Sequence, residues 1–224
     1  MAYLAETTNL LHPTQIGGRL KKSAIDTALL LTTEIESNKR RKRKTTTLLL
    51  DVKGAFDHVA KNQLLAILKR LRLLVNLISW ILSFLDDRQL RLSFDGQIEE
   101  FSLIDTGIPQ GSPVSPILFL IYIRELFQSS SVRYLSYMDD ISMTVSSTSF
   151  RKNVEILERE ATKLYELGAQ NAIQFDLAKT KLIYFAKCVD AKGALNLLNG
   201  ETIQPKVKCV DTKCALILPN GVII

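Results

Sequence analysis

Two adjacent aspartates separate two runs of residues that are typical of strands. Asp139 and Asp140 lie between VRYLSYM (132–138) and ISMTVS (141–146). Two such runs with only two residues between them predict an antiparallel hairpin whose turn carries both carboxylates. Adjacent carboxylates repel each other, so a turn that holds them together favours a bound cation. The chain must therefore fold so that a sheet presents acidic side chains at the end of a hairpin.

A third carboxylate follows another strand pattern. Asp51 ends the threonine-rich and apolar run of 45–52, which is typical of a buried strand. If this strand neighbours the hairpin, Asp51 and Asp139 converge on one site. Mg²⁺ prefers oxygen ligands, and two such ions about 3.5–4 Å apart activate a hydroxyl and stabilise a leaving pyrophosphate. The pattern indicates nucleotidyl transfer. A second pair, Asp86-Asp87, follows a helical pattern and is interpreted as a solvated loop.

Apolar residues recur at helical spacing in four segments: 23–36, 61–85, 117–127 and 150–167. The first segment begins at Ser23 and carries Asp26 three residues later, which predicts a capping box. The second is long enough for about six turns of a single helix. The last is expected to end at Gly168, a residue type that commonly terminates helices.

Further strand patterns complete the expected fold. Residues 88–104 alternate on both sides of Asp95-Gly96, which predicts a hairpin. AIQFDL (172–177) and KLIYFAK (181–187) predict two more strands on either side of Lys179-Thr180. Helices mixed with antiparallel hairpins predict an α+β fold with an antiparallel sheet and packed helices.

The charge of the chain is concentrated in one place. The formal net charge is +6, and residues 39–44 are six consecutive lysines and arginines, so the rest of the chain is formally neutral. We weigh three interpretations of this basic run: a solvated loop, a nuclear localisation signal, and a loop that contacts phosphates.

Composition excludes several classes of protein. Three cysteines without CxxC spacing argue against a disulfide framework or a zinc site. The first residues lack the basic and apolar regions of a secretory signal. The longest uncharged apolar run, 73–85, is thirteen residues and too short to span a bilayer. We expect an intracellular protein with no membrane partner, and we favour the nucleus.

The motifs resemble those of a known family. LLLDVKGAFDHV (48–59), GIPQGSPVSPILF (107–119) and YMDD (137–140) occur in the order found in reverse transcriptases of non-LTR retrotransposons, most closely the fungal kind. The resemblance runs from His12 to Lys187. It also includes three further stretches: QIGGRLKKSAIDTALLL, WILSFLDDRQ and FDLAKTKLIYF.

This resemblance implies a right-hand polymerase palm that copies an RNA template onto a DNA primer with dNTPs. Asp51, Asp139 and Asp140 would be the catalytic carboxylates and would bind Mg²⁺, or Mn²⁺, together with the backbone carbonyl of Val52. Phe56 would be the aromatic gate that clashes with a ribose 2′-hydroxyl. Without the neighbouring motif, a plain core phenylalanine is the favoured interpretation of Phe56.

Other positions match further parts of the family's pattern. Gln110 and Gly111 correspond to the turn beside the template base and the incoming nucleotide. Lys179 corresponds to a lysine near the triphosphate that donates a proton to pyrophosphate, although an exposed lysine at a strand end explains it as well. Arg19, Lys21 and Lys22 fall in the fingers segment that grips the template, and they could otherwise be ordinary surface charges.

The resemblance divides the chain into three parts: partial fingers with a basic loop (1–44), the palm (45–187), and a degenerate or frame-altered tail (188–224). No thumb is recognised, so we expect weak or absent polymerase activity from this chain alone. The alternatives are a non-catalytic palm remnant that binds RNA and a protein similar to group II intron maturases. A telomerase is a weaker alternative.

Overall fold

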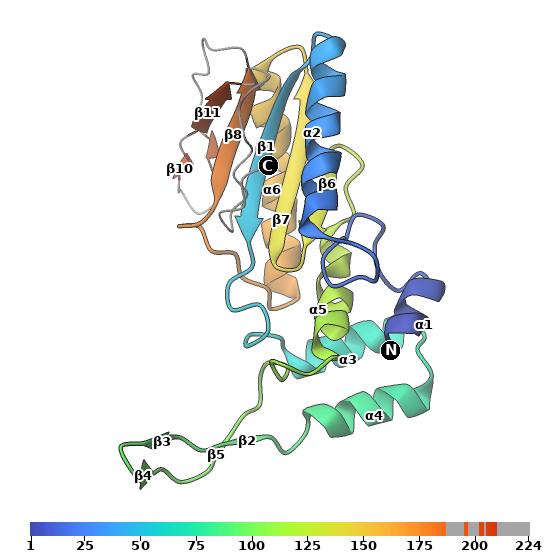
Figure 1. Ribbon diagram of the computed structural model, residues 1–224, viewed down its shortest axis with the longest axis vertical. Coiled ribbons are helices and arrows are strands. Elements are labelled where there is room, and N and C mark those ends of the chain that lie inside the picture. Colours follow the sequence, from blue (N-terminus) through green and yellow to red (C-terminus); the bar gives the residue numbers. More distant parts are fainter. Residues whose placement is uncertain (187–194, 197–201, 204, 210–224) are drawn as a thin grey trace.

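A computed structural model describes residues 1–186, 195–196, 202–203 and 205–209. Its centre is a five-stranded sheet in the order β11-β8-β1-β7-β6 (Figure 1). The strands are β1 (Lys44–Asp51), β6 (Arg133–Tyr137), β7 (Asp140–Ser147), β8 (Lys181–Ala186) and β11 (Pro205–Cys209). All pairs are antiparallel except β11 with β8. The α+β prediction is confirmed.

The central strand β1 separates two apolar clusters because successive side chains of a strand point to opposite faces. Leu48 and Leu50 are buried in the larger cluster, which also contains residues of α3, α4, α5 and α6. Leu49 packs against the smaller cluster, which includes Leu31 and Ile35 of α2. Both faces of the sheet are therefore covered by helices.

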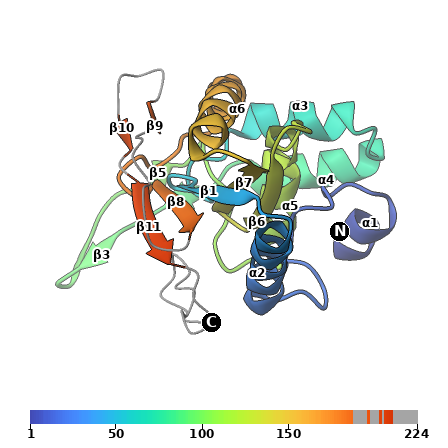
Figure 2. The ribbon, with the colours of Figure 1, turned by 90° about the horizontal axis from the view of Figure 1, so that it is seen from above.

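Helices α2 (Ala24–Arg40) and α6 (Phe150–Gln170) lie on opposite sides of the sheet (Figure 2). The predicted capping box is confirmed, since the Ser23 side chain accepts from the Asp26 backbone N–H and the Asp26 side chain accepts in return. Helix α5 (Ser115–Ile123) is buried along its whole length and continues into a 3₁₀ turn (Arg124–Leu126). A short helix, α1 (Ala2–Thr7), precedes these elements.

The single helix expected over 61–85 is wrong, because the chain forms α3 (Lys61–Arg70) and α4 (Val75–Leu85). Arg72 has a φ of 56° and Leu74 is extended at its ψ of 134°, and neither conformation continues a right-handed helix. The break lets each helix turn its own apolar side chains, among them Leu64 and Ile81, into the same core.

The predicted hairpin of 88–104 is confirmed. Strands β2 (Gln89–Leu90) and β5 (Ser102–Leu103) form its base, and β3 (Ser93–Phe94) and β4 (Gln97–Ile98) form its tip. Asp95 and Gly96 have φ values of 48° and 80°, as the two central residues of a type I′ turn require. The hairpin extends away from the sheet and helices (Figure 1).

The strand expected at 172–177 is wrong. Phe175 forms only an isolated bridge to Val52, and the chain then turns, with the Lys179 N–H donating to the Asp176 carbonyl at 3.2 Å. The Lys53 N–H donates to the Gln174 carbonyl and the Asp176 N–H donates to the Asp51 carbonyl, and these two bonds form the bridge at the end of β1. The turn that follows prevents the pairing from continuing into a strand.

Gly168 does not end α6, which continues to Gln170 and is followed by Asn171 as its C-cap. A side chain at Gly168 would place its Cβ 2.9 Å from the Phe175 ring and 3.0 Å from the Ile173 carbonyl oxygen. Glycine is needed here for close approach of the chain that returns to the sheet.

The basic run is also not the loop we expected. Lys39 and Arg40 end α2, residues 41–43 form a tight turn, and Lys44 begins β1. The expected tail, 188–224, lies largely outside the described residues, although β9 (Leu195–Asn196), β10 (Thr202–Ile203) and β11 fall within it. Among the described residues, no helix has both the length and the apolar composition to cross a bilayer.

Replacement of Gly168 by alanine should destabilise the fold, although alanine is the better helix former. The Cβ would overlap the Ile173 carbonyl and the Phe175 ring, and overpacking of this kind costs roughly 1–3 kcal/mol. Urea unfolding measures the change. Ala169→Gly, at the exposed neighbouring position, reports helix propensity alone. Unchanged or higher stability of Gly168→Ala would contradict the packing argument.

Candidate active site

The three predicted carboxylates lie at one end of the sheet. The register of β1 with β7 places Asp51 opposite Asp140, and the register of β6 with β7 places Tyr137 opposite the same Asp140. Asp139 occupies the turn, where its carbonyl accepts a hydrogen bond from the Val52 N–H at 3.1 Å. The expectation that the strands are neighbours is therefore confirmed, and the acidic hairpin is bonded to the end of β1.

The turn that carries the aspartates has an unusual backbone. Met138 has a φ of 56°, a conformation that side chains other than glycine adopt at a cost. The Ser136 hydroxyl stabilises the turn by donating to the Met138 carbonyl at 3.1 Å.

The segment 14–17 supports this hairpin from the edge of the sheet. The Ser136 N–H donates to the Thr14 carbonyl at 3.0 Å, and the Ile16 N–H donates to the Ser136 carbonyl at 2.8 Å. Gln15 is completely buried, and its amide donates to the Leu120 carbonyl at 2.8 Å. A Cβ on Gly17 would lie 2.4 Å from the Met138 backbone nitrogen, so only glycine allows this contact. The family resemblance includes the stretch that begins at Gln15, but the sequence predicted no role for Gln15 or Gly17.

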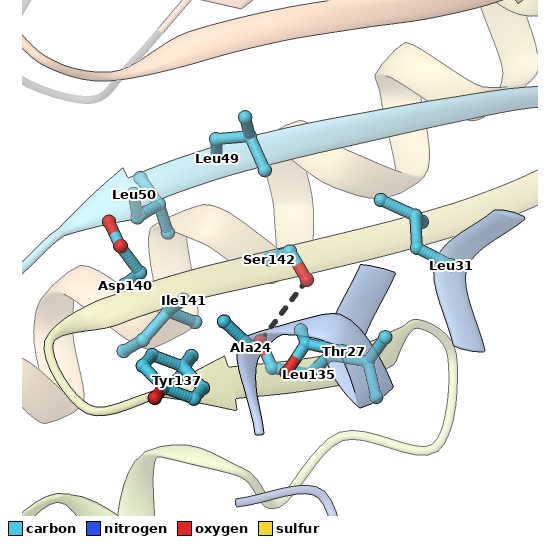
Figure 3. Close-up of a pocket in the computed structure, with 10 residues that line it drawn as sticks. All are labelled: Ala24, Thr27, Leu31, Leu49, Leu50, Leu135, Tyr137, Asp140, Ile141 and Ser142. Carbon is cyan, nitrogen blue, oxygen red and sulfur yellow. Dashed lines mark hydrogen bonds between the residues drawn. The ribbon is translucent and has the colours of Figure 1, made fainter. Parts of the chain in front are cut away.

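Electrostatic repulsion is concentrated on Asp140. Burial and the nearby charges of Asp139 and Asp51 raise the pKa of Asp140 from 3.8 to about 6, and Lys179 and Lys181 offset part of this effect. Asp140 lies at the edge of a small pocket of about 50 Å³ between α2 and the sheet, which Ala24, Thr27 and Leu31 line from the helix side (Figure 3).

Lys179 supplies the positive charge nearest to Asp51. Its ammonium lies 3.0 Å from Asp51 Oδ2 and 3.9 Å from Asp176 Oδ2, and the hydrogen bond with Asp51 raises the pKa of Lys179. The turn at 176–178 that replaced the expected strand is what carries this lysine back to the end of β1.

The chemistry of these groups fits a divalent cation, because carboxylate oxygens are the ligands that Mg²⁺ prefers. A cation among them would also relieve the repulsion on Asp140. Over the described residues, however, no group of three or more histidine, cysteine, aspartate or glutamate side chains is arranged to hold a metal ion. In this structure the Lys179 ammonium is the cation bound at Asp51.

Two loops beside the carboxylates are bonded to each other. The Ile108 N–H donates to the Phe56 carbonyl, and the Gly107 N–H to the Val59 carbonyl, both at 2.8 Å. The Gln110 side chain donates to Asp57 Oδ1 at 3.0 Å. These bonds fix the predicted gate and the predicted nucleotide-binding turn relative to each other.

The Phe56 ring is half-buried and stacks on Phe119, with ring centroids 5.3 Å apart. It therefore contributes to the core while part of its surface stays accessible, and its role as a gate stays a prediction. Gly111 has a φ of 87°, and a Cβ at this position would meet no other described part of the chain within 4 Å. Its turn therefore requires glycine for conformation and not for space.

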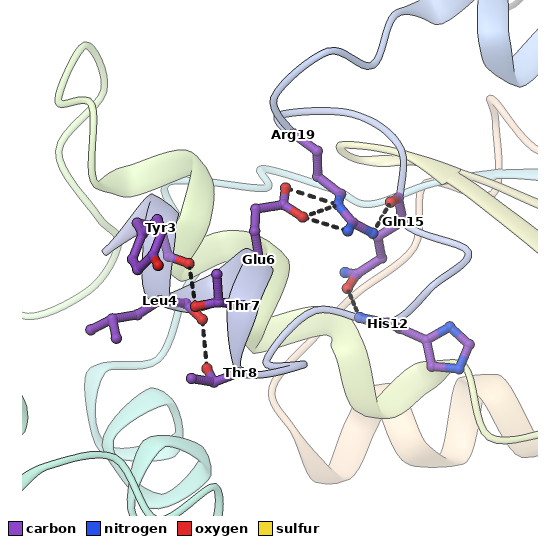
Figure 4. Close-up of polar contacts among 8 residues, drawn as sticks. All are labelled: Tyr3, Leu4, Glu6, Thr7, Thr8, His12, Gln15 and Arg19. Atoms are coloured by element: carbon purple, nitrogen blue, oxygen red, sulfur yellow. Dashed lines mark hydrogen bonds and ion pairs between the residues drawn. The ribbon is translucent and has the colours of Figure 1, made fainter.

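Arg19 has a structural partner that the sequence did not suggest. Its guanidinium donates to both carboxylate oxygens of Glu6 and to the Gln15 carbonyl, which ties α1 to the segment beside the hairpin (Figure 4). Lys21 and Lys22 are exposed. The predicted template contacts of all three residues stay predictions.

The second aspartate pair has a different environment. Asp86 pairs with Lys61, which joins the end of α4 to the start of α3, and Asp87 has a φ of 49° in the loop that leaves α4. This agrees with the interpretation of Asp86-Asp87 as a loop after a helix.

Gly17→Ala should reduce any activity of the site because its Cβ would displace the Met138 backbone, and misplacement by about 1 Å costs on the order of 10²-fold. Initial rates of primer extension measure the loss, and circular dichroism verifies that the variant is folded. A folded variant with wild-type rates would show that the hairpin does not depend on this contact.

The pKa of Asp140 predicts how stability varies with pH when no divalent metal is present. Its folded-state pKa lies above the unfolded value, so the proton stabilises the folded state at low pH. The free energy of unfolding should therefore fall as the pH rises from about 4 to about 6. The fall should be only roughly 1–2 kcal/mol, because water screens part of the repulsion on this partly exposed group.

Urea unfolding in EDTA at several pH values measures this slope. Asp140→Asn should remove most of this pH dependence. Asp86→Asn should leave the pH dependence in place, because Lys61 lowers the pKa of Asp86 and does not raise it. An identical slope in wild type and Asp140→Asn would mean that another group causes it.

The comparison of sequences agrees with the geometry. The reverse transcriptase (RNA-dependent DNA polymerase) family model matches residues 1–210. The chain is 26% identical over 148 residues to the RNA-directed DNA polymerase from mobile element jockey of Drosophila funebris, covering 62% of this chain and 16% of that protein. It is 31% identical over 121 residues to the retrovirus-related Pol polyprotein from type-1 retrotransposable element R2 of Popillia japonica, covering 53% and 17%. The chain thus spans about a sixth of these relatives.

Solved structures share the fold at low identity. Apo telomerase from Candida tropicalis, truncated from its C-terminal domain, aligns with a TM-score of 0.60 and 14% identity over 88% of this chain and 40% of that one. Telomerase from Candida albicans in complex with a TWJ fragment of telomeric RNA gives 0.58 and 14% over 88% and 35%. These likenesses confirm the palm-like fold. With the carboxylate hairpin and the match over nearly its whole length, the chain belongs to the reverse transcriptase family.

Proposed function

We propose that this chain is the polymerase palm of a non-LTR retrotransposon and that it extends a DNA primer with dNTPs on an RNA template. The observation that carries the proposal is the register that puts Asp51 opposite Asp140, with Asp139 in the adjoining turn. The mobile-element relatives support the choice of an RNA template and of this kind of element. The fungal origin is part of the same proposal.

Asp51, Asp139 and Asp140 would hold two Mg²⁺ or Mn²⁺ ions, with the Val52 carbonyl as a further ligand. When bound, such ions supply activation of the primer 3′-hydroxyl and stabilisation of the leaving pyrophosphate. The raised pKa of Asp140 favours this role, because a cation relieves the repulsion that Asp139 and Asp51 exert on it.

Lys179 would change partners during the reaction. It donates to Asp51 at 3.0 Å in this structure, and a metal ion at Asp51 would take its place there. The released ammonium is exposed and carried on a turn, so it can donate a proton to the pyrophosphate oxygen.

Phe56 and Gln110 would select and position the nucleotide. The accessible part of the Phe56 ring would exclude a ribose 2′-hydroxyl, which favours dNTPs, and its stacking on Phe119 keeps the ring rigid. The bond from Gln110 to Asp57 would hold the turn with Gly111 beside the template base. Lys21, Lys22 and Arg19 would contact the template from the fingers part, 1–44, next to the palm of 45–187.

Primer extension tests the proposal. The protein is given an RNA template, an annealed DNA primer, dNTPs and Mg²⁺ or Mn²⁺, and we expect short products. Asp139→Asn should lower the rate by on the order of 10³-fold, since metal-ion catalysis contributes several kcal/mol. Asp86→Asn is the matched control, because it removes the same charge from the aspartate pair that is bonded to Lys61.

Two results would count against the proposal. Equal loss in both variants would remove the special role of Asp139. No extension by a folded wild-type protein that still binds the primer–template would favour the alternative, a palm that binds RNA without catalysis.

A further inference from the structure

The basic run lies at the opposite end of the sheet from the carboxylates. Lys44 begins β1 and Asp51 ends it, so seven residues of extended chain separate the two ends by about 23 Å at 3.3 Å per residue. Helix α2 ends at the same place (Figure 1). None of the roles proposed for the active site uses this end of the molecule.

The turn that carries the charges has a defined geometry. The Arg43 N–H donates to the Asn38 carbonyl at 2.8 Å and the Lys42 N–H to the Lys39 carbonyl at 3.0 Å, which is the Schellman pattern that ends helices. Lys42 occupies the left-handed position of this motif with a φ of 57°. Glycine is the usual residue at that position because it adopts the conformation without strain, so the chain keeps a cation where an uncharged residue would be more stable.

The charges of the turn are not balanced. All six side chains of 39–44 are exposed, and in the described part of the chain Arg40 to Arg43 form no ion pair. The helix macrodipole accounts for cations in the last turn of α2, namely Lys39 and Arg40, but not for the four that follow.

The start of α6 adds to the same surface. The pairing of Lys44 with Ser147 brings this helix to the basic end of the sheet, and the Lys44 ammonium lies 4.9 Å from the centre of the Phe150 ring. Lys152 is exposed two residues later. We name Arg40, Arg41, Lys42, Arg43 and Lys152 the basic end.

We propose that the basic end is a second nucleic-acid-binding surface, which contacts backbone phosphates about 23 Å from the carboxylates. Closely spaced, unpaired arginines and lysines on a fixed turn bind phosphates and release counterions from them. The inference deepens the proposed function and rests on it for the presence of a nucleic-acid substrate. An anionic membrane is a poorer match, because the described residues from 36 to 44 include no exposed large apolar side chain that would enter a bilayer.

The test measures binding without catalysis. Fluorescence anisotropy follows single-stranded RNA, single-stranded DNA and an RNA–DNA duplex at several salt concentrations, without dNTPs or divalent metal. The logarithm of affinity falls with the logarithm of salt by about 0.7 per contacted phosphate for a single strand and about 0.9 for a duplex. Neutralisation of four cations, R40Q/R41Q/K42Q/R43Q, should therefore make the slope less steep by about 2.8 to 3.6.

A matched pair of variants separates position from charge. R41Q/R43Q and K69Q/R72Q each remove two exposed cations, the first from the basic end and the second from the α3–α4 connection. The first should reduce the slope by about 1.4 to 1.8, and the second should leave it unchanged. Equal effects of the two variants would overturn the proposal, since binding would then depend only on net charge.

Lys42→Gly gives an independent readout. It should raise the melting temperature, because glycine suits the left-handed position, and it should weaken nucleic-acid binding at the same time. Weaker binding with a lower melting temperature would mean that the turn had been disrupted, and unchanged binding would remove Lys42 from the surface.

Two further comparisons complete the test. One distinguishes lipid from nucleic acid as the source of the phosphates, and the other separates binding at the basic end from polymerisation. Anionic vesicles that bind the wild type while RNA and DNA do not would overturn the proposal. Slopes that change as expected in a protein without primer extension would support the basic end and count against the proposed polymerase. Normal primer extension with unchanged salt slopes would support the proposed polymerase and overturn the proposal for the basic end.

Discussion

The pairing of β1 with β7 is the constraint on which the rest of the structure depends. It places Asp51 opposite Asp140 on the face of the sheet that α2 covers, while Leu48 and Leu50 point into the larger core. A shift of one residue would turn Asp51 toward the larger core and turn Leu48 and Leu50 toward the face that α2 covers, so the apolar pattern of the strands fixes the position of the carboxylate. The electrostatic repulsion among these charges is concentrated in the site, where Asp140 is held next to two other carboxylates. A cation among these carboxylates would relieve that repulsion.

Distant segments keep this strained end of the sheet in place. Segment 14–17 bonds to Ser136 on the edge strand, Val52 bonds to the acidic turn, and the chain around Phe175 returns to the end of β1. Glycine is required at Gly17 and Gly168 because backbone or ring atoms approach each of them closely. The carboxylates are thus positioned by backbone contacts on several sides, which is what electrostatic catalysis requires of a preorganised site.

Local patterns predicted the elements whose causes are local. The capping box at Ser23, the turn at Asp95-Gly96 and the hairpin around Asp139 are determined by neighbouring residues, and all three were predicted. The break at Arg72 is closed by local bonds, from the Arg72 N–H to the Lys69 carbonyl and from the Leu73 N–H to the Leu68 carbonyl, but no glycine marks it in the sequence. The course of 172–177 depends on bonds to Asp51 and Lys53, far along the chain, and the periodicity carries no trace of them. The same holds for the site. Asp51, Asp139 and Asp140 were found because carboxylates after strands are a visible signal, whereas Gln15 and the Glu6–Arg19 pair act through contacts that no spacing reveals.

The distribution of charge limits how this chain can attract nucleic acid. Without the six cations of 39–44, the formal charge of +6 falls to zero, so the body of the protein has no general attraction for phosphates. The negative charges of Asp51, Asp139 and Asp140 repel phosphates unless cations are bound among them. Attraction must then come from separate clusters: the exposed Lys21 and Lys22, and the basic end at the far end of β1. Lys21 and Lys22 lie just before α2 and the basic end lies where α2 ends, and the 17 residues of this helix span about 26 Å at 1.5 Å per residue. Because salt screens exposed charges beyond about 10 Å at 0.1 M, the two clusters act on different parts of a bound strand. On the proposed roles, binding at the basic end and catalysis at the carboxylates lie at opposite ends of β1, so a change in one can leave the other intact.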